Sequence, residues 1–194
     1  MAKSIGPKKI RTAVFISGKG SNLKNLIKFS LKKKSPIRII LIVSNNPKAK
    51  GLEYSKIYKI KKKIYNYNKK KISETKTLKD LKSNDIKLIC LAGFMKILSE
   101  NFIRKFKGKI LNIHPSLLPK YKGLKTHERV IKNKEKYSGC TVHLVNSKLD
   151  SGKIILQKRV KLSKKETPLS LQKKILKHEH ILYPEAIDKI FVNP

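Results

Sequence analysis

The chain has 194 residues, 39% of them hydrophobic, and carries a formal net charge of +36. This length suits a single domain with a full hydrophobic core, and the compact apolar runs exclude a disordered chain. No apolar run approaches the roughly 20 residues of a membrane-spanning helix, and residues 1–10 lack a signal-peptide core, so we expect a cytoplasmic protein with no membrane partner.

Strand-like and helix-like patterns alternate between residues 11 and 113. Short continuous apolar runs predict buried strands at 11–17, 37–44, 64–67, 88–91 and 110–113. Apolar residues at helical spacing predict helices at 23–27, 52–60, 75–81 and 99–106. In the last of these helices Ser99 is the expected N-cap. Continuous apolar strands that alternate with helices are typical of an α/β domain whose mostly parallel sheet is covered on both faces.

The pattern changes after residue 137. Residues 141–146 and 154–162 alternate between apolar and polar side chains, which predicts a C-terminal antiparallel hairpin. A closing helix is expected over residues 169–190, with Pro184 kinking or breaking it. Because the sequence contains no Ser/Gly-rich linker and no repeat, we expect one domain over residues 1–194, with residues 1–10 as a flexible extension.

A glycine-containing loop, residues 18–22, follows the first predicted strand. Ligands of a parallel sheet bind at the carboxyl ends of its strands, where this loop is expected to lie. Gly20 permits a close backbone approach, and Ser21 and Asn22 offer hydrogen-bond donors to an anion at a helix N-terminus. The loop lacks the third glycine of a dinucleotide fingerprint, so its residues alone favour an ordinary turn.

The segment 112–119, NIHPSLLP, is more informative. Asn112 and His114 are separated by one residue at a strand end, so their side chains point to the same side. An amide beside an imidazole is suited to stabilising an oxyanion, and Asp150 of the hairpin could keep His114 cationic. The residues alone equally allow a structural role for His114 and a turn-forming role for Asp150.

No metal site is predicted. The five histidines accompany no C-x-x-C motif. Cys90 and Cys140 are isolated within apolar runs, which favours buried thiols over a disulfide or a metal site.

Five segments together resemble the glycinamide ribonucleotide transformylases, a family of folate-dependent formyltransferases. In chain order they are ISGKGSNL, LAGFMKILS, ILNIHPSLLPKYKGLKTH, GCTVHLVNSKLDSG and HEHILYP. The resemblance covers nearly the whole chain and implies a single Rossmann-like formyltransferase domain. It also implies transfer of the formyl group of 10-formyltetrahydrofolate to the glycyl amine of phosphoribosylglycinamide, a step of de novo purine biosynthesis, with no metal.

The resemblance further implies roles for single residues. Asn112 and His114 would stabilise the oxyanion of a tetrahedral intermediate, while Asp150 would support a cationic His114 and order a water for proton transfer. The ribonucleotide would be bound by four residues: Gly20, Ser21, Asn22 and Glu179.

The folate site implied by the resemblance is less complete. Asn112 and the segment 95–98 would contact the folate, and the loop 145–150 would cover it. The residues of that segment are Met95, Lys96, Ile97 and Leu98. His143 and Thr141 match positions of the pocket, where structural roles are equally open to them. The arginine that contacts folate in the family has no clear counterpart, and Lys69, Lys70 or Lys71 would replace it.

Three other functions remain open. A hydrolase of the same family would ordinarily carry an extra N-terminal domain, for which the ten residues before the first strand leave no room. A methionyl-tRNA formyltransferase needs a C-terminal RNA-binding domain, whereas this chain ends after its closing helix. A basic RNA-associated protein would make His114 and Asp150 incidental.

The composition argues against a nucleic-acid partner. Only five of the 48 basic residues are arginine, and isoleucine outnumbers alanine by 25 to 5. Lysine and isoleucine have A/T-rich codons, so base drift explains the charge without selection for a polyanion. A specific reader of nucleic acid would use more arginine, because its guanidinium group binds phosphate and guanine in a bidentate manner. We therefore expect small-molecule substrates, no specific nucleic acid, and either a monomer or a homodimer.

Overall fold

The structure is a computed structural model that describes residues 9–192 of the chain. Within these residues one seven-stranded sheet has the order β3-β2-β1-β4-β5-β6-β7. Residues 1–8, which make up most of the expected flexible extension, lie outside the described residues. Ile10, the last residue of that expected extension, instead begins the central strand β1 (Ile10–Ile16).

The sheet is parallel over its first five strands and ends in an antiparallel hairpin, as predicted. The parallel strands besides β1 are β2 (Ile37–Ser44), β3 (Lys61–Ile64), β4 (Leu88–Leu91) and β5 (Lys109–His114). The hairpin consists of β6 (Tyr137–Leu144) and β7 (Ile154–Lys161), with β6 antiparallel to β5. β2 and β4 have the bounds that the apolar runs predicted.

The edge strand β3 differs from its prediction. The sequence pattern predicted a strand over residues 64–67, whereas the structure places it at Lys61–Ile64, with all of its residues exposed. This strand pairs only with residues 41–44 of β2. A lysine-rich strand at the edge of a sheet needs no buried apolar run, so hydrophobicity alone could not locate it.

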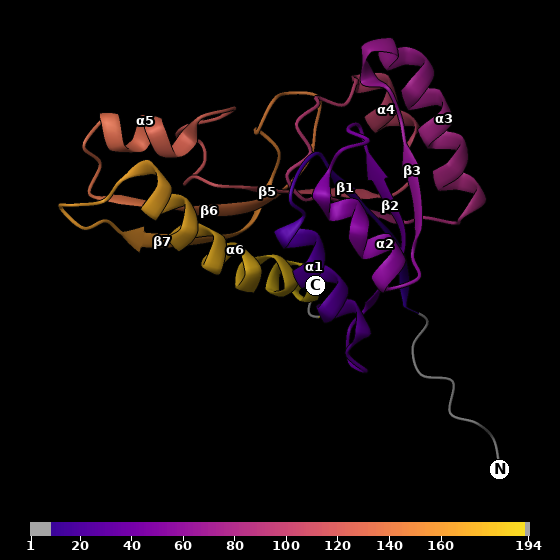
Figure 1. The fold of residues 1–194 in the computed structure, drawn as a ribbon, viewed down its shortest axis with the longest axis horizontal. Helices are drawn as coiled ribbons and strands as arrows, with labels where there is room; N and C mark the ends of the chain where they lie inside the picture. Colours follow the sequence, from indigo (N-terminus) through magenta and orange to yellow (C-terminus); the bar gives the residue numbers. More distant parts are fainter. Residues whose placement is uncertain (1–8, 193–194) are drawn as a thin grey trace.

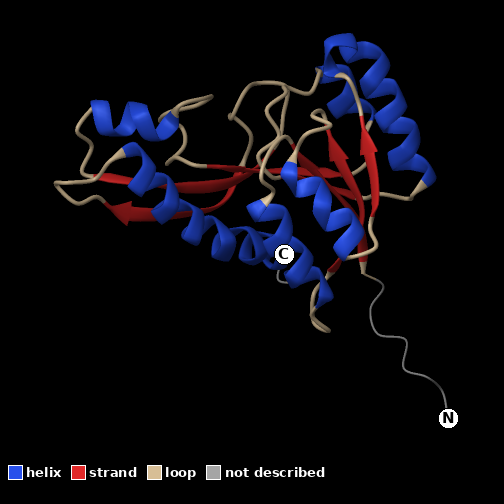
Figure 2. Ribbon diagram, in the orientation of Figure 1, coloured by secondary structure: helices blue, strands red, loops and turns tan. Residues whose placement is uncertain are grey.

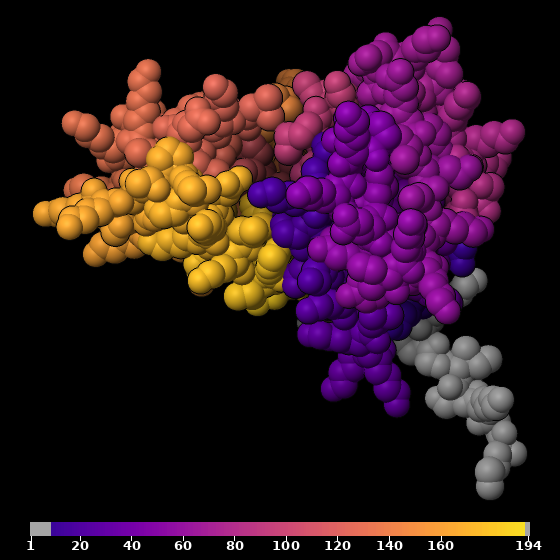
Figure 3. Space-filling view, viewed as in Figure 1, coloured from indigo at the N-terminus to yellow at the C-terminus, as the bar shows by residue number. Residues whose placement is uncertain are grey.

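Helices cover both faces of the sheet (Figures 1 and 2). One face packs against α1 (Ser21–Leu31), α2 (Glu53–Ile57), α5 (Thr126–Lys132) and α6 (Pro168–Phe191). The other face packs against α3 (Lys70–Ser83) and α4 (Glu100–Lys105). Two short 3-10 turns, Lys50–Leu52 and Tyr67–Lys69, precede α2 and α3. In the space-filling view the hairpin and α6, in orange and yellow, form one side of the molecule (Figure 3).

Strand β1 shows why the apolar runs are continuous. Val14 and Ile16 belong to the core cluster beneath α1 and α6, whereas Ala13 and Phe15 belong to the cluster beneath α3 and α4. All four side chains are fully buried. A strand that is covered on both faces needs apolar residues in both sets of alternating positions.

The helix predictions had mixed outcomes. Ser99 caps α4, accepting a hydrogen bond from the backbone N–H of Phe102 at 3.1 Å, as predicted. The helix predicted over residues 52–60 is shorter, because α2 ends at Ile57. Of the kink or break predicted at Pro184, the break is wrong, since α6 continues through it to Phe191. The short helix α5 had no prediction.

Candidate active site

The predicted site residues lie around the ends of β1, β4 and β5. The loops after β1 and β4 are joined by two hydrogen bonds. The backbone N–H of Ser17 donates to the carbonyl of Gly93 at 3.0 Å, and the backbone N–H of Met95 donates to Ser17 Oγ at 2.8 Å. The strand order reverses between β1 and β4, and such a switch point is where open α/β sheets bind their ligands.

Four polar side chains meet beside this point. Asn112 and His114 extend from β5, His143 extends from β6 opposite Asn112, and Asp150 comes from the connection between β6 and β7. His114 Nδ1 lies 3.4 Å from Asp150 Oδ2, and His143 Nε2 lies 3.6 Å from Asp150 Oδ1. Asn112 Nδ2 lies 3.2 Å from His143 Nε2 and 3.5 Å from Asp150 Oδ1. The structure thus brings together Asn112, His114 and Asp150, and it adds His143.

Backbone carbonyls determine which nitrogen of each neutral imidazole carries hydrogen. His114 Nε2 lies 2.8 Å from the carbonyl oxygen of Tyr121, which can only accept, so Nε2–H is the donor. In the same way His143 Nδ1–H donates to the carbonyl of Leu144 at 2.9 Å. His143 Nε2 is then an acceptor for the amide of Asn112. In the neutral His114 ring, Nδ1 presents a lone pair towards Asp150.

Burial lowers the pKa of His114 below its ordinary value of 6.5, although the Tyr121 carbonyl and the Asp150 carboxylate both favour the cation. This direction opposes the expected cationic state, because burial disfavours the charged ring while the Asp150 carboxylate favours it. The charge of His114 during the reaction stays a prediction. Burial raises the pKa of Asp150, but the two neighbouring imidazole rings and the backbone N–H of Gly123 together hold it below its usual value, which favours the carboxylate. The Gly123 N–H donates to Asp150 Oδ2 at 2.8 Å.

The glycine-containing loop adjoins the last helix. Gly20 has φ 73°, and a Cβ atom there would lie 2.7 Å from Gly51 Cα, so both the conformation and the close approach require glycine. α1 begins at Ser21, and the Asn22 amide donates to Glu179 Oε2 on α6 at 2.7 Å. Burial raises the pKa of Glu179, and the bond from Asn22 opposes that rise. Asn22 Oδ1 is buried without a hydrogen-bond partner among the described residues.

The segment after β4 leaves large apolar side chains in solvent. Met95 and Ile97 are 61% and 60% exposed, whereas Leu98 is buried in the core cluster beneath α3 and α4. Leu149, on the loop that precedes Asp150, is 49% exposed. Exposed apolar residues beside a polar cluster are typical of a ligand site. Lys69, Lys70 and Lys71 are all exposed where the second 3-10 turn passes into α3.

Three groups that hold the catalytic candidates were not predicted from the sequence. The carbonyl of Tyr121 and the N–H of Gly123 are backbone groups, which no residue type identifies. His143 matched only a pocket position of uncertain role, although its alternation with Thr141 on β6 could have placed both on the face of Asn112. Within residues 9–192 no cluster of His, Cys, Asp and Glu side chains is arranged to hold a metal ion. None of the helices in this part of the chain combines the length and the hydrophobicity that a membrane span requires.

Comparisons with known proteins give consistent results. The family model described as formyl transferase matches residues 10–187. The phosphoribosylglycinamide formyltransferase of Haemophilus influenzae is 39% identical over 182 residues, which cover 91% of this chain and 85% of that protein. The trifunctional purine biosynthetic protein adenosine-3 of Bos taurus is also 39% identical, over 190 residues. That alignment covers 96% of this chain but only 19% of the bovine protein.

Solved structures have the same fold. The phosphoribosylglycinamide formyltransferase of Brucella melitensis matches with a TM-score of 0.89 and 39% identity, covering 94% of this chain and 96% of that chain. The phosphoribosylglycinamide formyltransferase of Anaplasma phagocytophilum matches with a TM-score of 0.88 and 40% identity, covering 96% of this chain and 88% of that chain.

Proposed function

This chain belongs to the formyl transferase family, and from this premise we propose that it transfers the formyl group of 10-formyltetrahydrofolate to the glycyl amine of phosphoribosylglycinamide. The convergence of Asn112, His114 and Asp150 at the end of β5 carries the proposal. The proposed acceptor is taken from the names of the phosphoribosylglycinamide formyltransferases of Haemophilus influenzae and Brucella melitensis, each 39% identical to this chain. The reaction belongs to purine biosynthesis in this proposal.

The pair His114 and Asp150 accepts the proton that the attacking amine loses. In the neutral ring, the Nδ1 lone pair of His114 faces the Asp150 carboxylate at 3.4 Å, so a proton bound between them satisfies both atoms. The amine nitrogen attacks the formyl carbon, and its proton passes through a water to this pair. As the C–N bond to the folate breaks, the proton passes to the departing nitrogen, and tetrahydrofolate and the formylated amine result.

Asn112 stabilises the tetrahedral oxyanion. One N–H of its amide donates to His143 Nε2 at 3.2 Å, which fixes the orientation of the amide. The contact of the same nitrogen with Asp150 is long, at 3.5 Å, so the second N–H is available to a developing negative charge. Once His114 is protonated, its positive charge lies beside the same oxygen.

The ribonucleotide binds between the N-terminus of α1 and α6. The N–H groups at the start of α1 favour a phosphate group, and Gly20, Ser21 and Asn22 hold it there. Glu179, which accepts a hydrogen bond from Asn22, binds the ribose hydroxyl groups. The buried Oδ1 atom of Asn22 offers an acceptor to the same ligand.

The folate binds over the segment after β4. The exposed Met95 and Ile97 side chains cover its apolar ring system, with Lys96 and Leu98 completing the segment. Asn112 contacts it near the formyl group, and the loop 145–150 closes over it.

Formyl transfer measured with three acceptors tests the proposal. The purified chain receives 10-formyltetrahydrofolate with phosphoribosylglycinamide, with water alone, or with initiator methionyl-tRNA. We expect turnover with the ribonucleotide, and loss of turnover by orders of magnitude in His114→Ala with both substrates still bound. Preferred transfer to water or to tRNA would instead identify a hydrolase or a tRNA formyltransferase.

A further inference from the structure

A cavity lies at the amino ends of β1, β2 and β3, at the opposite end of the sheet from His114. Its volume is about 580 Å³. β3 begins at Lys61, opposite Leu41, so residues 37–40 of β2 have no partner strand on that side among the described residues. The cavity adjoins this open edge and the turn that leads from α2 into β3. An open edge also offers backbone N–H groups that no neighbouring strand uses.

The cavity combines an apolar base with a cationic surface. Ile27, Ile39, Tyr58 and Ile60 belong to the core cluster beneath α1 and α6, whereas Ile40 packs against the cluster beneath α3 and α4. The cavity therefore extends round the open edge of β2. The basic residues in its lining are Lys9, Arg11, Arg38, Lys59 and Lys61. No carboxylate contributes to the lining within residues 9–192.

Arg11 and Arg38 are the most informative of these cations. They are register partners on the parallel strands β1 and β2, and like charges directly opposite each other destabilise a sheet. Arg11 Nε donates to the carbonyl of Asn84 at 2.7 Å, and that is its one hydrogen bond to a described residue. Arg38 is exposed and makes no hydrogen bond or ion pair within residues 9–192.

The scarcity of arginine strengthens this observation. Only five residues of the chain are arginine, and two of them lie side by side in this cavity. The codon drift that explains the many lysines does not explain a pair of arginines. A guanidinium group binds phosphate through two parallel hydrogen bonds, which lysine cannot do. An anion between Arg11 and Arg38 would relieve their repulsion.

We propose that this cavity binds a small phosphate ester with an apolar or aromatic body, of the class of nucleoside monophosphates. The phosphate lies between Arg11 and Arg38, with Lys59 and Lys61 nearby. The body of the ligand packs against Ile40, which lies on the side of the two arginines, and against Ile60 at the open edge of β2. The cavity volume lies within the roughly 300–1,000 Å³ that is usual for sites of small organic ligands. This site is separate from the proposed ribonucleotide site, which lies at the carboxyl ends of the strands.

Calorimetric titration of the full chain with adenosine monophosphate, adenosine and inorganic phosphate tests the proposal. We expect the monophosphate to bind with one-to-one stoichiometry, and more tightly than adenosine or phosphate. Arg38→Gln should weaken it about tenfold, because one charged hydrogen-bond pair is lost. Arg11→Lys keeps the charge and loses the planar fork, so it should also weaken binding.

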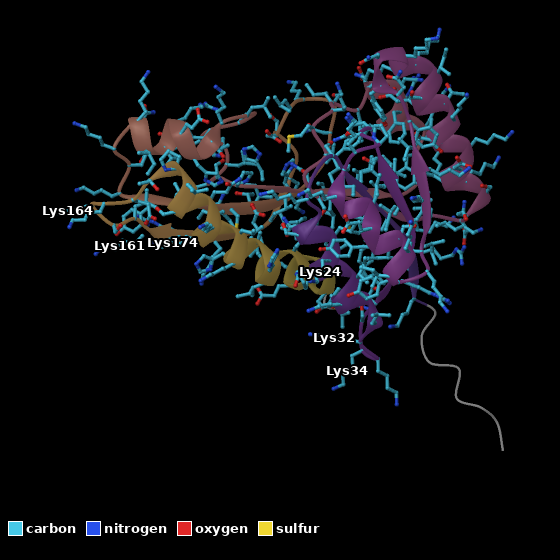
Figure 4. All side chains as sticks on the ribbon, viewed as in Figure 1. Lys24, Lys32, Lys34, Lys161, Lys164 and Lys174 are labelled. Atoms are coloured by element: carbon cyan, nitrogen blue, oxygen red, sulfur yellow. The ribbon has the colours of Figure 1, made fainter. Side chains whose placement is uncertain are left out.

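Matched variants separate this site from general charge attraction and from the substrate site. Lys34→Gln removes the same charge at an exposed position after α1 that does not line the cavity (Figure 4), and it should leave the monophosphate affinity nearly unchanged. Ser21→Ala should also leave this affinity unchanged, and Arg38→Gln should leave formyl transfer unchanged. Three results would overturn the proposal. The first is an equal loss of monophosphate affinity in Arg38→Gln and Lys34→Gln, and the second is loss of monophosphate binding in Ser21→Ala. The third is binding of single-stranded RNA without binding of the monophosphate.

Discussion

The site depends on a histidine whose protonation is set by opposing contacts. Burial lowers the pKa of His114, while the Tyr121 carbonyl and the Asp150 carboxylate raise it. The lowered pKa favours the neutral ring, which can take up a proton during the proposed reaction. A permanently cationic ring could not accept the proton of the amine. The lowered pKa thus favours proton transfer over static charge stabilisation by His114.

Replacing Asp150 by asparagine tests the charge of this contact. The size of the side chain is kept, while the carboxylate that raises the pKa of His114 is lost, so that pKa should fall further. A weaker base accepts the amine proton less readily, and turnover at neutral pH should fall by roughly 10²- to 10⁴-fold. Because the neutral ring is the acceptor, kcat/KM should decline as pH drops through the pKa of His114, and this decline should move to lower pH in the variant.

Nuclear magnetic resonance titration of the His114 ring in both proteins provides the measurement. Asn112→Ala serves as the comparison, since it removes an oxyanion donor but leaves the carboxylate in place. An unchanged histidine pKa together with unchanged turnover in Asp150→Asn would mean that Asp150 is only a turn residue.

Ser21→Ala tests the phosphate loop. Ser21 Oγ has no hydrogen bond to another described residue, so its removal sacrifices no internal contact. If the hydroxyl donates to the phosphate, the KM for phosphoribosylglycinamide should rise about tenfold, while the KM for the folate stays constant. Steady-state kinetics with each substrate varied in turn measures both values. Equal increases for the two substrates would contradict the assignment.

The long helix α6 shows how tertiary contacts stabilise an element against its own sequence. Pro184 has no N–H, so the carbonyl of His180, four residues earlier, loses its helical hydrogen bond. The Asn25 amide of α1 donates to that carbonyl at 2.5 Å. The helix therefore continues through the proline, because a neighbouring helix supplies the missing donor.

Removing this donor should destabilise the protein. Asn25→Ala leaves the His180 carbonyl unpaired and should lower the free energy of unfolding by about 1–3 kcal/mol. Pro184→Ala restores the helical N–H, so the same Asn25→Ala change should cost less in that background. Urea unfolding of the parent, the two single variants and the double variant gives the coupling. Equal costs of Asn25→Ala in both backgrounds would show that the amide does not act through the proline gap.

At the scale of the whole molecule, charge repulsion opposes folding. The net charge of +36 is spread over one domain. Figure 4 shows lysine side chains that extend into solvent, such as Lys164 at the left of the view and Lys34 at the bottom. Compact states of high net charge are destabilised by self-repulsion, which salt screens. The fold is therefore stable only if the burial of apolar side chains in its two core clusters contributes more free energy than this repulsion costs.

Thermal unfolding should consequently depend on ionic strength. Between about 0.01 M and 1 M salt the Debye length falls from about 30 Å to about 3 Å, so the Tm should rise. A gain of about 1 kcal/mol in the free energy of unfolding corresponds to a rise of about 2–4 °C in the Tm of a domain of this size. Sodium chloride and sodium acetate should act alike, because screening does not depend on the anion. A Tm that stays constant or falls with salt would show that repulsion is unimportant.

The sequence by itself determined the elements whose two sides are both buried. β2 and β4 were located to the residue, because a strand covered on both faces is apolar at nearly every position, with the exposed Arg38 as the exception in β2. Ser99 identified the start of α4 through its side-chain cap, and the spacing of Asn112 and His114 placed both on one side of β5. Cys90 and Cys140 are buried free thiols, as their apolar surroundings predicted.

The tertiary structure alone decided the contacts that depend on segments far apart in the chain. The edge strand β3 forms because β2 offers it hydrogen bonds, and α6 passes Pro184 because Asn25 is near. The proton position and pKa of His114 depend on the Tyr121 carbonyl and on the depth of burial. The pattern of apolar and polar residues shows only which side chains of a segment face the core and which face solvent. Each of these features depends instead on which groups come within hydrogen-bond distance after the chain has folded.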